Sequence, residues 1–272
     1  MAKILDGKII KAEGKEKLKK AFVELDFVPT LAIIQVGNRD DSNSYIASKK
    51  KFGEEIGVKV LHIVFDENVH ENEIITKIKE LNDDKNINGI IVQIPLPVHI
   101  DKDKIINTIN PGKDVDGLTS TSRFISATTL GIISLLNYYK IPLEGKKVTI
   151  VGRSSLVGKP TMLALLNEDA TVTICHSKTE NLKEHTQNAD ILIVAIGRPK
   201  FINHEFVSSG QIIIDVGTNI VDLPAQAGKK IVGDVDFDDV SDIVSAITPV
   251  PGGVGQMTVL SLFENVLKSC KK

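Results

Sequence analysis

The chain has 272 residues, enough for one large or two small domains with an ample core. Hydrophobic residues make up 42% and charged residues 25%, as in an ordinary globular protein, and the formal net charge of −2 gives no general attraction to nucleic acid or membrane surfaces. Two cysteines, Cys175 and Cys270, cannot build a disulfide framework, which favours a reducing compartment. We find no signal peptide, no apolar run near the roughly 20 residues of a membrane span, and no histidine spacing typical of a metal site.

The first half of the chain alternates predicted helices and strands. Helices are expected over 8–25, 43–56, 71–81 and 101–110, and strands over 31–36, 58–64 and 89–94. Apolar residues at helical spacing mark the inward faces of the first and third helices: Leu18, Ala21, Phe22, Leu25, and Ile74, Ile75, Ile78, Leu81. The strands are continuously apolar, which is typical of parallel sheets covered by helices on both faces.

The second half repeats this pattern after the turn-rich segment 111–126, where we place the domain junction. Helices are expected over 127–139, near 162–166 and 180–187, and over 256–268, and strands over 148–151, 171–175, 191–195 and 212–216. The last helix should bury Val259, Leu262, Phe263 and Val266. We therefore predict an α/β fold of two parallel-sheet lobes with a cleft between them. The expected domains are 1–120, completed by 256–272, and 121–255.

A glycine-containing turn in the second half predicts a dinucleotide site. The run KKVTIVGRSSLVGKP reads as a strand, then Gly152, then a helix that begins near Gly158. A glycine at the strand end allows a tight turn, and the helix offers free N–H groups and a positive dipole end to a pyrophosphate. Ser154 stands where the GxGxxG motif has its middle glycine, so a plain strand–helix turn stays an open alternative.

The next strand indicates which dinucleotide would bind. NAD-binding folds usually end this strand with an acid that holds the ribose 2′-hydroxyl, whereas this chain continues as His176-Ser177-Lys178. Arg153 in the first turn adds a guanidinium suited to a phosphate. These residues predict NADP as the cofactor. The alternative is that Arg153 and His176 are solvated turn residues.

Four side chains in the first half could serve chemistry. Tyr45 and Lys49 lie one helical turn apart, where the ring could stack on a flat ligand and a lysine of lowered pKa could move a proton. Gln93 ends a buried strand and could orient that lysine or a ligand. Either Asp114 or Asp116 could cap a turn, and Asp116, before Gly117, could also accept a ligand's N–H groups. From spacing alone, a basic surface helix and an internally satisfied glutamine remain alternatives.

Taken in order, these motifs resemble a known family. YIASK with Lys49, VQIPLP with Gln93, KDVDG with Asp116, GRSSLVGKP, TVTICHSKT, the run 212–219, GDVDF and ITPVPGGVG succeed one another along nearly the whole chain. The chain closely resembles the bifunctional methylenetetrahydrofolate dehydrogenase/methenyltetrahydrofolate cyclohydrolase family. Several of these motifs together are highly specific.

The resemblance implies a role for each matching residue. Lys49 would be the cyclohydrolase lysine, held by a hydrogen bond with Gln93, while Tyr45 would stack on the folate and Asp116 would bind the pterin N–H groups. Arg153 and Ser177 would hold the 2′-phosphate of NADP. The remaining cofactor-binding residues would be Gly152, Ser154, Val157, Gly158, His176, Thr218 and Asn219. In the run 249–255, which would border the cleft, Pro251, Gly252 and Gly253 would contact substrate.

The implied reaction has two steps. NADP⁺ would oxidise 5,10-methylenetetrahydrofolate to methenyltetrahydrofolate, and water would then convert that cation to 10-formyltetrahydrofolate. The second lobe would be a Rossmann-type domain, and the enzyme a cytoplasmic homodimer of one-carbon metabolism that supports purine biosynthesis. Two alternatives are a non-catalytic NADP-binding relative and another two-lobed dehydrogenase, similar to shikimate dehydrogenase.

Two stretches depart from the family pattern. Residues 126–131 read SATTLG where the family usually has PCTPxG, and the connection from Gly117 is short. Gln256 also replaces a proline of PGGVGPMT. We expect these changes to affect the hinge, the cleft wall and the balance of the two activities more than the fold.

Overall fold

The computed structural model describes residues 1–222 and 228–271, which form two compact units. The six-stranded unit comprises Met1–Ala12 and Thr128–Thr258, and the three-stranded unit comprises Glu13–Ala127 and Val259–Lys272. The predicted domains placed residues 1–12 with the first lobe. They lie instead in the six-stranded unit, because β1 (Lys3–Ile4) pairs in parallel with β11 (Ala246–Ile247) at its edge.

The three-stranded unit is a parallel sheet of order β3-β2-β4. Its strands are β2 (Thr30–Val36), β3 (Lys59–Phe65) and β4 (Gly89–Val92), and its helices are α1 (Gly7–Val23, shared with the other unit), α2 (Asp40–Ile56), α3 (Glu71–Asp83), α4 (Lys102–Asn107) and α9 (Val254–Cys270, also shared). All seven residues of β2 are buried, since this strand is central and covered on both faces.

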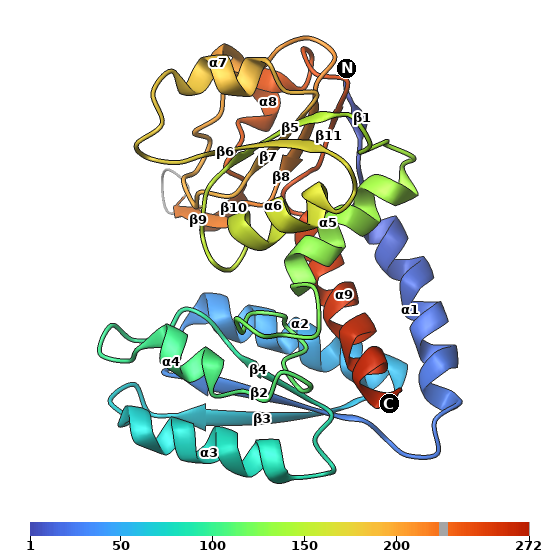
Figure 1. Cartoon of the computed structure of the whole chain (residues 1–272), viewed down its shortest axis with the longest axis vertical. Coiled ribbons are helices and arrows are strands. Elements are labelled where there is room, and N and C mark those ends of the chain that lie inside the picture. Colours follow the sequence, from blue (N-terminus) through green and yellow to red (C-terminus); the bar gives the residue numbers. More distant parts are fainter. Residues whose placement is uncertain (223–227, 272) are drawn as a thin grey trace. The chain divides into compact units, whose positions relative to one another are not determined.

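Alternate residues of β2 build two separate cores. Ala32, Ile34 and Val36 pack with isoleucines of α3 and α4 such as Ile78 and Ile105. On the opposite face, Phe52 of α2 and Phe263 of α9 stack with ring centroids 5.3 Å apart. Helices therefore cover both faces of the sheet: α3 and α4 share the core on one face, and Figure 1 shows α3 on the other side of the strands from α2 and α9.

The six-stranded unit is a parallel sheet of order β1-β11-β8-β7-β5-β6. Besides β1 and β11 its strands are β5 (Lys147–Val151), β6 (Thr171–Cys175), β7 (Ile191–Val194) and β8 (Ile212–Asp215). Its helices are α5 (Ala127–Tyr138), α6 (Gly158–Leu166), α7 (Leu182–Gln187), α8 (Phe237–Val240) and the 3₁₀ turn η1 (His204–Phe206). Figure 1 shows α7 and α8 on one side of this sheet and α5 and α6 on the other.

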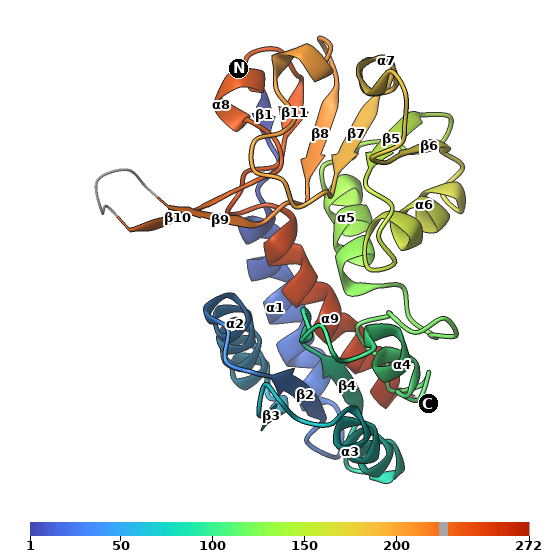
Figure 2. The same ribbon diagram turned by 90° about the vertical axis from the view of Figure 1, so that its left-hand side faces the viewer.

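The strand order reverses beside β5, with β6 on one side of it and β7 on the other. This is the topological switch point of a Rossmann fold, where ligands bind at the carboxyl ends of the strands. Next to the sheet stands an antiparallel hairpin of β9 (Asn219–Asp222) and β10 (Lys229–Val232) (Figure 2).

The predicted α/β class, the parallel sheets and the Rossmann-type order are confirmed, and the predicted helices and strands occur within a few residues of their expected ends. The inward residues predicted for the last helix are all buried. The sequence interpretation missed β1, β11, α8 and the hairpin. Elements of two to four residues are too short to show a hydrophobic period. Among the described helices, none is long and apolar enough to cross a membrane.

Candidate active site

Helix α2 places Lys49 inside the three-stranded unit. The lysine is only 9% exposed, and Tyr45, one turn earlier, is half-buried, so the basic surface helix of the alternative interpretation is not what forms here. Lys49 Nζ donates a hydrogen bond of 3.0 Å to Oε1 of Gln93. That partner follows directly after β4, at the carboxyl end of this edge strand.

Gln93 is held so that its oxygen faces the lysine. Its Nε2 donates to the carbonyl of Ile94 at 2.9 Å, and its backbone N–H donates to the carbonyl of Ile34 at 2.8 Å. The bond from Nε2 to Ile94 fixes the orientation of the amide, so that Oε1, its only acceptor, points toward Lys49. The lysine–glutamine hydrogen bond implied by the resemblance is therefore present, with the lysine as donor.

Lys49 and Asp116 both shift toward their neutral forms. Burial lowers the pKa of Lys49, and the negative charge of Asp116 only partly opposes that effect. Burial likewise raises the pKa of Asp116, against the opposing influence of Lys49. A buried lysine of lowered pKa can accept and return a proton, which an exposed lysine does poorly near neutral pH.

The loop that carries Asp116 is shaped by a neighbouring carboxylate. Asp114 is 1% exposed, and its oxygens accept from the N–H groups of Gly117 at 3.1 Å and Thr119 at 2.8 Å. Of the two aspartates in the KDVDG run, Asp114 thus caps the turn. Asn265 of α9, fully buried, donates to the carbonyls of residues 115 and 125 at 2.9 and 3.0 Å and so ties both arms of the loop together.

A second polar network anchors the start of α2. Gln35 on β2 is 2% exposed; its Nε2 donates to Oδ1 of Asn43, and its Oε1 accepts from Nε2 of His62, both at 2.8 Å. Asn43 lies in the first turns of α2, two residues before Tyr45. Sequence analysis missed Gln35, Asn43, His62 and Asn265, although a polar residue inside an apolar strand, as in LAIIQV, is a signal that could have identified Gln35.

In the six-stranded unit, the glycine turn after β5 is required by close backbone contact. Gly152 has φ +123°, and a Cβ there would lie 2.2 Å from the carbonyl oxygen of Ala195. A Cβ on Gly158 would lie 2.0 Å from the carbonyl oxygen of Gly152. Both positions therefore exclude any side chain, as in turns that bring the backbone close to a pyrophosphate.

Ser154, at the position of the missing glycine, caps the helix that follows. Its Oγ accepts from the N–H groups of Val157 at 3.1 Å and Gly158 at 3.5 Å, and its carbonyl accepts from Lys159 at 3.0 Å. The expectation that α6 offers its first N–H groups freely is therefore only partly met. Side chains at the carboxyl ends of these strands must therefore balance more of the negative charge of a bound phosphate.

Those side chains emerge together from neighbouring strands. Val151 pairs with Cys175, so Arg153 and Ser177 each follow the paired position by two residues, and both are exposed. His176 is half-buried, and its Nδ1 accepts from the N–H of Lys178 at 3.1 Å, which leaves Nε2–H as its donor when the ring is neutral. No acidic residue ends β6, which fits a 2′-phosphate.

The other predicted residues of this unit lie at two further sites. Thr218 is exposed after β8, and Asn219 donates from Nδ2 to Oδ1 of Asp234 at 2.8 Å. Gly252 and Gly253 are buried before α9, where the N–H of Gly7 donates to the carbonyl of Gly252 at 2.9 Å. Pro251 beside them is exposed.

The departures from the family pattern have local structural roles. The backbone N–H of Gln256 donates to the carbonyl of Gly253 at 3.1 Å, a bond that a proline could not make, and its Oε1 accepts from Lys11 at 3.2 Å. In the SATTLG run, Thr129 is fully buried and its hydroxyl bonds to that of Thr161 at 2.9 Å. Gln256 and Thr129 are thus both bonded within the six-stranded unit.

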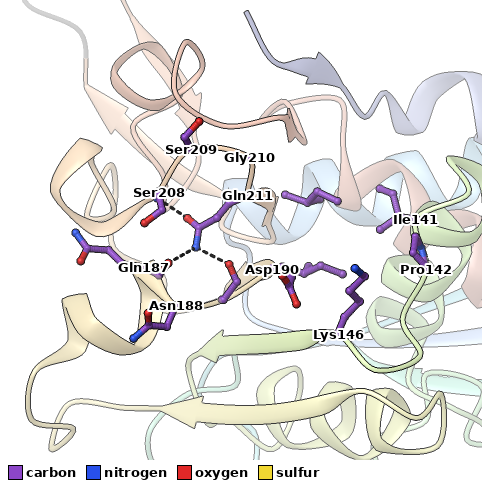
Figure 3. A pocket seen from close by; sticks show the side chains of 13 residues that line it. Ile141, Pro142, Lys146, Gln187, Asn188, Asp190, Ser208, Ser209, Gly210 and Gln211 are labelled. Carbon is purple, nitrogen blue, oxygen red and sulfur yellow. Dashed lines mark hydrogen bonds between the residues drawn. The ribbon is translucent and has the colours of Figure 1, made fainter.

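A separate pocket of about 460 Å³ lies at the end of the six-stranded sheet where β5, β7 and β8 begin (Figure 3). Lys146, Asp190 and Gln211 line it, each just before the amino end of a strand. Gln211 is 3% exposed, and its amide bonds to three backbone carbonyls and one N–H of the surrounding turns. The pocket is therefore distinct from the dinucleotide site, which belongs to the carboxyl ends. In the described residues, no three His, Cys, Asp or Glu side chains are grouped to hold a metal ion.

The fold and these two sets of residues define a two-unit α/β protein of the dinucleotide-dependent dehydrogenase class, with a buried lysine in its other unit. Two family models identify a family within that class. The model described as "Tetrahydrofolate dehydrogenase/cyclohydrolase, catalytic domain" matches residues 5–116, and the corresponding "NAD(P)-binding domain" matches residues 126–272. The chain belongs to the tetrahydrofolate dehydrogenase/cyclohydrolase family.

Relatives resemble the chain over its full length. The "Bifunctional protein FolD" of Agathobacter rectalis is 46% identical over 284 aligned positions, covering 100% of both chains, and that of Lachnoclostridium phytofermentans is 47% identical, covering 100% and 99%. The Campylobacter jejuni FolD structure matches with 43% identity and a TM-score of 0.93, covering 100% and 99% of the two chains. The Trypanosoma brucei FolD structure, complexed with NADP cofactor and inhibitor, matches with 32% identity and a TM-score of 0.95, covering 99% and 97%.

The shikimate-dehydrogenase alternative is not favoured. The Thermus thermophilus shikimate 5-dehydrogenase shares 13% identity with this chain at a TM-score of 0.55. That likeness is one of fold alone.

Proposed function

We propose that this protein oxidises 5,10-methylenetetrahydrofolate to 5,10-methenyltetrahydrofolate with NADP⁺ and then hydrolyses the product to 10-formyltetrahydrofolate. The observation that carries the proposal is the buried Lys49, bonded to Gln93 and lowered in pKa, in a chain of this family. A non-catalytic NADP-binding relative would have no need of this arrangement.

Lys49 is the residue that manages protons during hydrolysis. Water must lose a proton as it attacks the methenyl carbon, and a ring nitrogen must gain one as the ring opens. Neutral Lys49 Nζ takes the first proton and returns it for the second, while Gln93 Oε1 holds the amine in one orientation. Asp116, whose carboxylate is held by the capped loop, accepts the N–H groups of the pterin, and Tyr45 stacks on its ring.

The residues of the six-stranded unit fit NADP. The glycine turn allows close approach of the pyrophosphate, and Arg153 with Ser177 would hold the 2′-phosphate, since neither strand end carries a repelling acid. When bound, NADP⁺ supplies a hydride acceptor. Pro251, Gly252 and Gly253 would contact the substrate, while Thr218 and Asn219 complete the cofactor set.

The direct test is to supply the purified full-length protein with methylenetetrahydrofolate and NADP⁺. We expect reduced cofactor to form, followed by decay of the methenyl product faster than its spontaneous hydrolysis. Reduction without accelerated decay would leave only the dehydrogenase half of the proposal. Absence of both reactions would reject it.

We also propose that the protein works as a homodimer in the cytoplasm and supplies one-carbon units for purine biosynthesis. Membership of the family supports this proposal. Sedimentation tests the assembly: a mass near that of one 29.6 kDa chain would contradict the dimer.

A further inference from the structure

Asp234, in the GDVDF run, is a buried carboxylate that the proposed reaction does not use. It is fully buried, and each of its oxygens accepts two hydrogen bonds. Oδ2 accepts from the backbone N–H groups of Ile196 at 2.7 Å and Gly197 at 2.9 Å. Oδ1 accepts from the N–H of Arg198 and from Nδ2 of Asn219, both at 2.8 Å. Four donors therefore converge on the two oxygens of this one side chain.

A second buried carboxylate holds Asp234 in place. Asp215, at the end of β8, is 3% exposed, and its oxygens accept from the N–H groups of Asp234 and Val235 at 3.0 Å and of Gly217 at 2.9 Å. Its own N–H donates to the hydroxyl of Thr248 at 2.7 Å. These hydrogen bonds fix the backbone around Asp234 to the end of β8.

Two glycines make room for this pair of carboxylates. A Cβ on Gly217 would lie 2.4 Å from Cγ of Asp234, and a Cβ on Gly233 would lie 1.8 Å from Oδ2 of Asp215. The segments 216–219 and 233–235 could not approach each other this closely with side chains at these positions. The two carboxylates are therefore part of the architecture of this end of the sheet.

The segments that Asp234 holds lie where a dinucleotide binds. Residues 195–198 follow β7 and residues 216–219 follow β8, at the carboxyl ends of the strands on one side of the switch point. The glycine turn comes close to the first of these segments, since a Cβ on Gly152 would lie 2.2 Å from the carbonyl oxygen of Ala195. Arg153 and Ser177 belong to the other side, at β5 and β6. A dinucleotide that extends across the switch point places its second half over β7 and β8.

We propose that Asp234, supported by Asp215, is a positioning residue that fixes the segments 195–198 and 216–219 for the nicotinamide half of NADP. The inference rests on the proposed cofactor role of this edge and goes beyond it, because neither carboxylate needs to touch the cofactor. Asp234 accepts hydrogen bonds from four donors that would otherwise bond to water. These bonds hold the backbone of the two segments in one conformation. A pre-shaped segment avoids the ordering cost that a loose loop incurs on binding.

The test is the substitution Asp234→Asn in the full-length protein. An amide offers one accepting oxygen and one donating nitrogen, so it turns two of the four bonds into donor–donor contacts. We expect KM and Kd for NADP⁺ to rise at least about tenfold, as the loss of charge-assisted bonds implies. Cyclohydrolase activity should stay within about twofold of wild type, since Lys49 and Gln93 belong to the other unit. The matched control is Asp238→Asn, the same change on a side chain of α8 that directly follows this run and is 85% exposed, which should leave both activities unchanged.

Each outcome decides the inference. Unchanged NADP⁺ affinity, or an equal fall in both activities, would overturn it, because the first shows no positioning and the second shows only a structural role. Calorimetric binding of NADP⁺ separates this inference from the proposed function. A wild type that binds NADP⁺ without turnover, and loses affinity on Asp234→Asn, would reject the reaction and keep the positioning role.

Hydrogen exchange of the cofactor-free wild type decides the case in which Asp234→Asn does not fold. The amides of residues 196–198 should exchange much more slowly than in an unstructured peptide of the same sequence. Exchange at the peptide rate would show that the segment is not held before NADP binds, and would overturn the inference.

Discussion

The buried polar groups to which we assign roles in the two units differ in their hydrogen-bond partners. In the three-stranded unit, the buried Lys49 bonds to another side chain, Gln93, and its pKa is lowered by burial. In the six-stranded unit, the buried carboxylates of Asp215 and Asp234 bond mainly to backbone N–H groups, and the charged side chains that would meet the cofactor are exposed.

This difference follows from what each unit must do. Proton transfer needs one atom of suitable pKa, and burial lowers the pKa of an amine such as that of Lys49. Binding a dinucleotide needs a backbone of defined shape with charges that a phosphate can reach. Substitutions in the first unit should therefore change a rate, and substitutions in the second should change affinity or stability.

The largest effect is expected from Lys49→Met, which keeps most of the side-chain volume and removes the amine. Cyclohydrolase activity should fall at least about 100-fold, the low end of what a positioned proton-transfer group contributes. Dehydrogenase activity should fall much less, because hydride transfer needs no protein base. The measurement compares decay of methenyltetrahydrofolate, corrected for spontaneous hydrolysis, with its formation. Wild-type hydrolysis by the variant would remove Lys49 from the mechanism.

Gly152→Ala should show that the second unit depends on backbone shape. The new Cβ meets the carbonyl of Ala195 in a backbone conformation that disfavours side chains, so we expect the free energy of unfolding to fall by about 3 kcal/mol. Urea denaturation measures it. The control is Gly145→Ala, at φ +70° with no atom within 4 Å of the added Cβ, which should cost only about 1 kcal/mol. Equal losses would mean that the contact with Ala195 is unimportant.

Arg153→Ala tests whether an exposed charge in the second unit recognises the 2′-phosphate. Loss of a charge-assisted bond costs about 1.5–3 kcal/mol, so NADP⁺ should bind roughly tenfold more weakly or worse. Binding of NAD⁺, which lacks that phosphate, should change less. Titration of both cofactors provides the comparison, and equal weakening would show that Arg153 does not distinguish them.

The last prediction concerns pH and Asp215. Burial raises the pKa of Asp215 from 3.8 to about 7, so the folded state binds this proton more tightly than the unfolded state. The contribution is fully present below about pH 4 and is lost as the pH rises through about 7. The free energy of unfolding should therefore decrease by at most about 1.4 kcal/mol per pH unit in that window.

Denaturation of wild type and Asp215→Asn between these pH values isolates the contribution. The variant has no titrating group at this position and should show a shallower decrease. Parallel curves for the two proteins would contradict the raised pKa.

Much of the fold and part of the site were determined by the sequence alone. Continuous apolar runs such as LAIIQV define buried parallel strands, because both faces of such a strand are covered. The spacing of Tyr45 and Lys49 sets them one helical turn apart, and the interval from Gly152 to Gly158 marks the turn between β5 and α6. These features are local, since each depends on residues within one or two turns of chain.

Only the tertiary structure decided which of these residues are buried together. Lys3 pairs with Ala246, Asn265 ties the loop of Asp116, and Asp234 holds residues 196–198. The pKa of Lys49 is likewise lowered by burial, and its neighbours Gln93 and Asp116 come from segments distant in the sequence. Burial and long-range hydrogen bonds arise from contacts between distant segments, and no period or spacing within one segment encodes them.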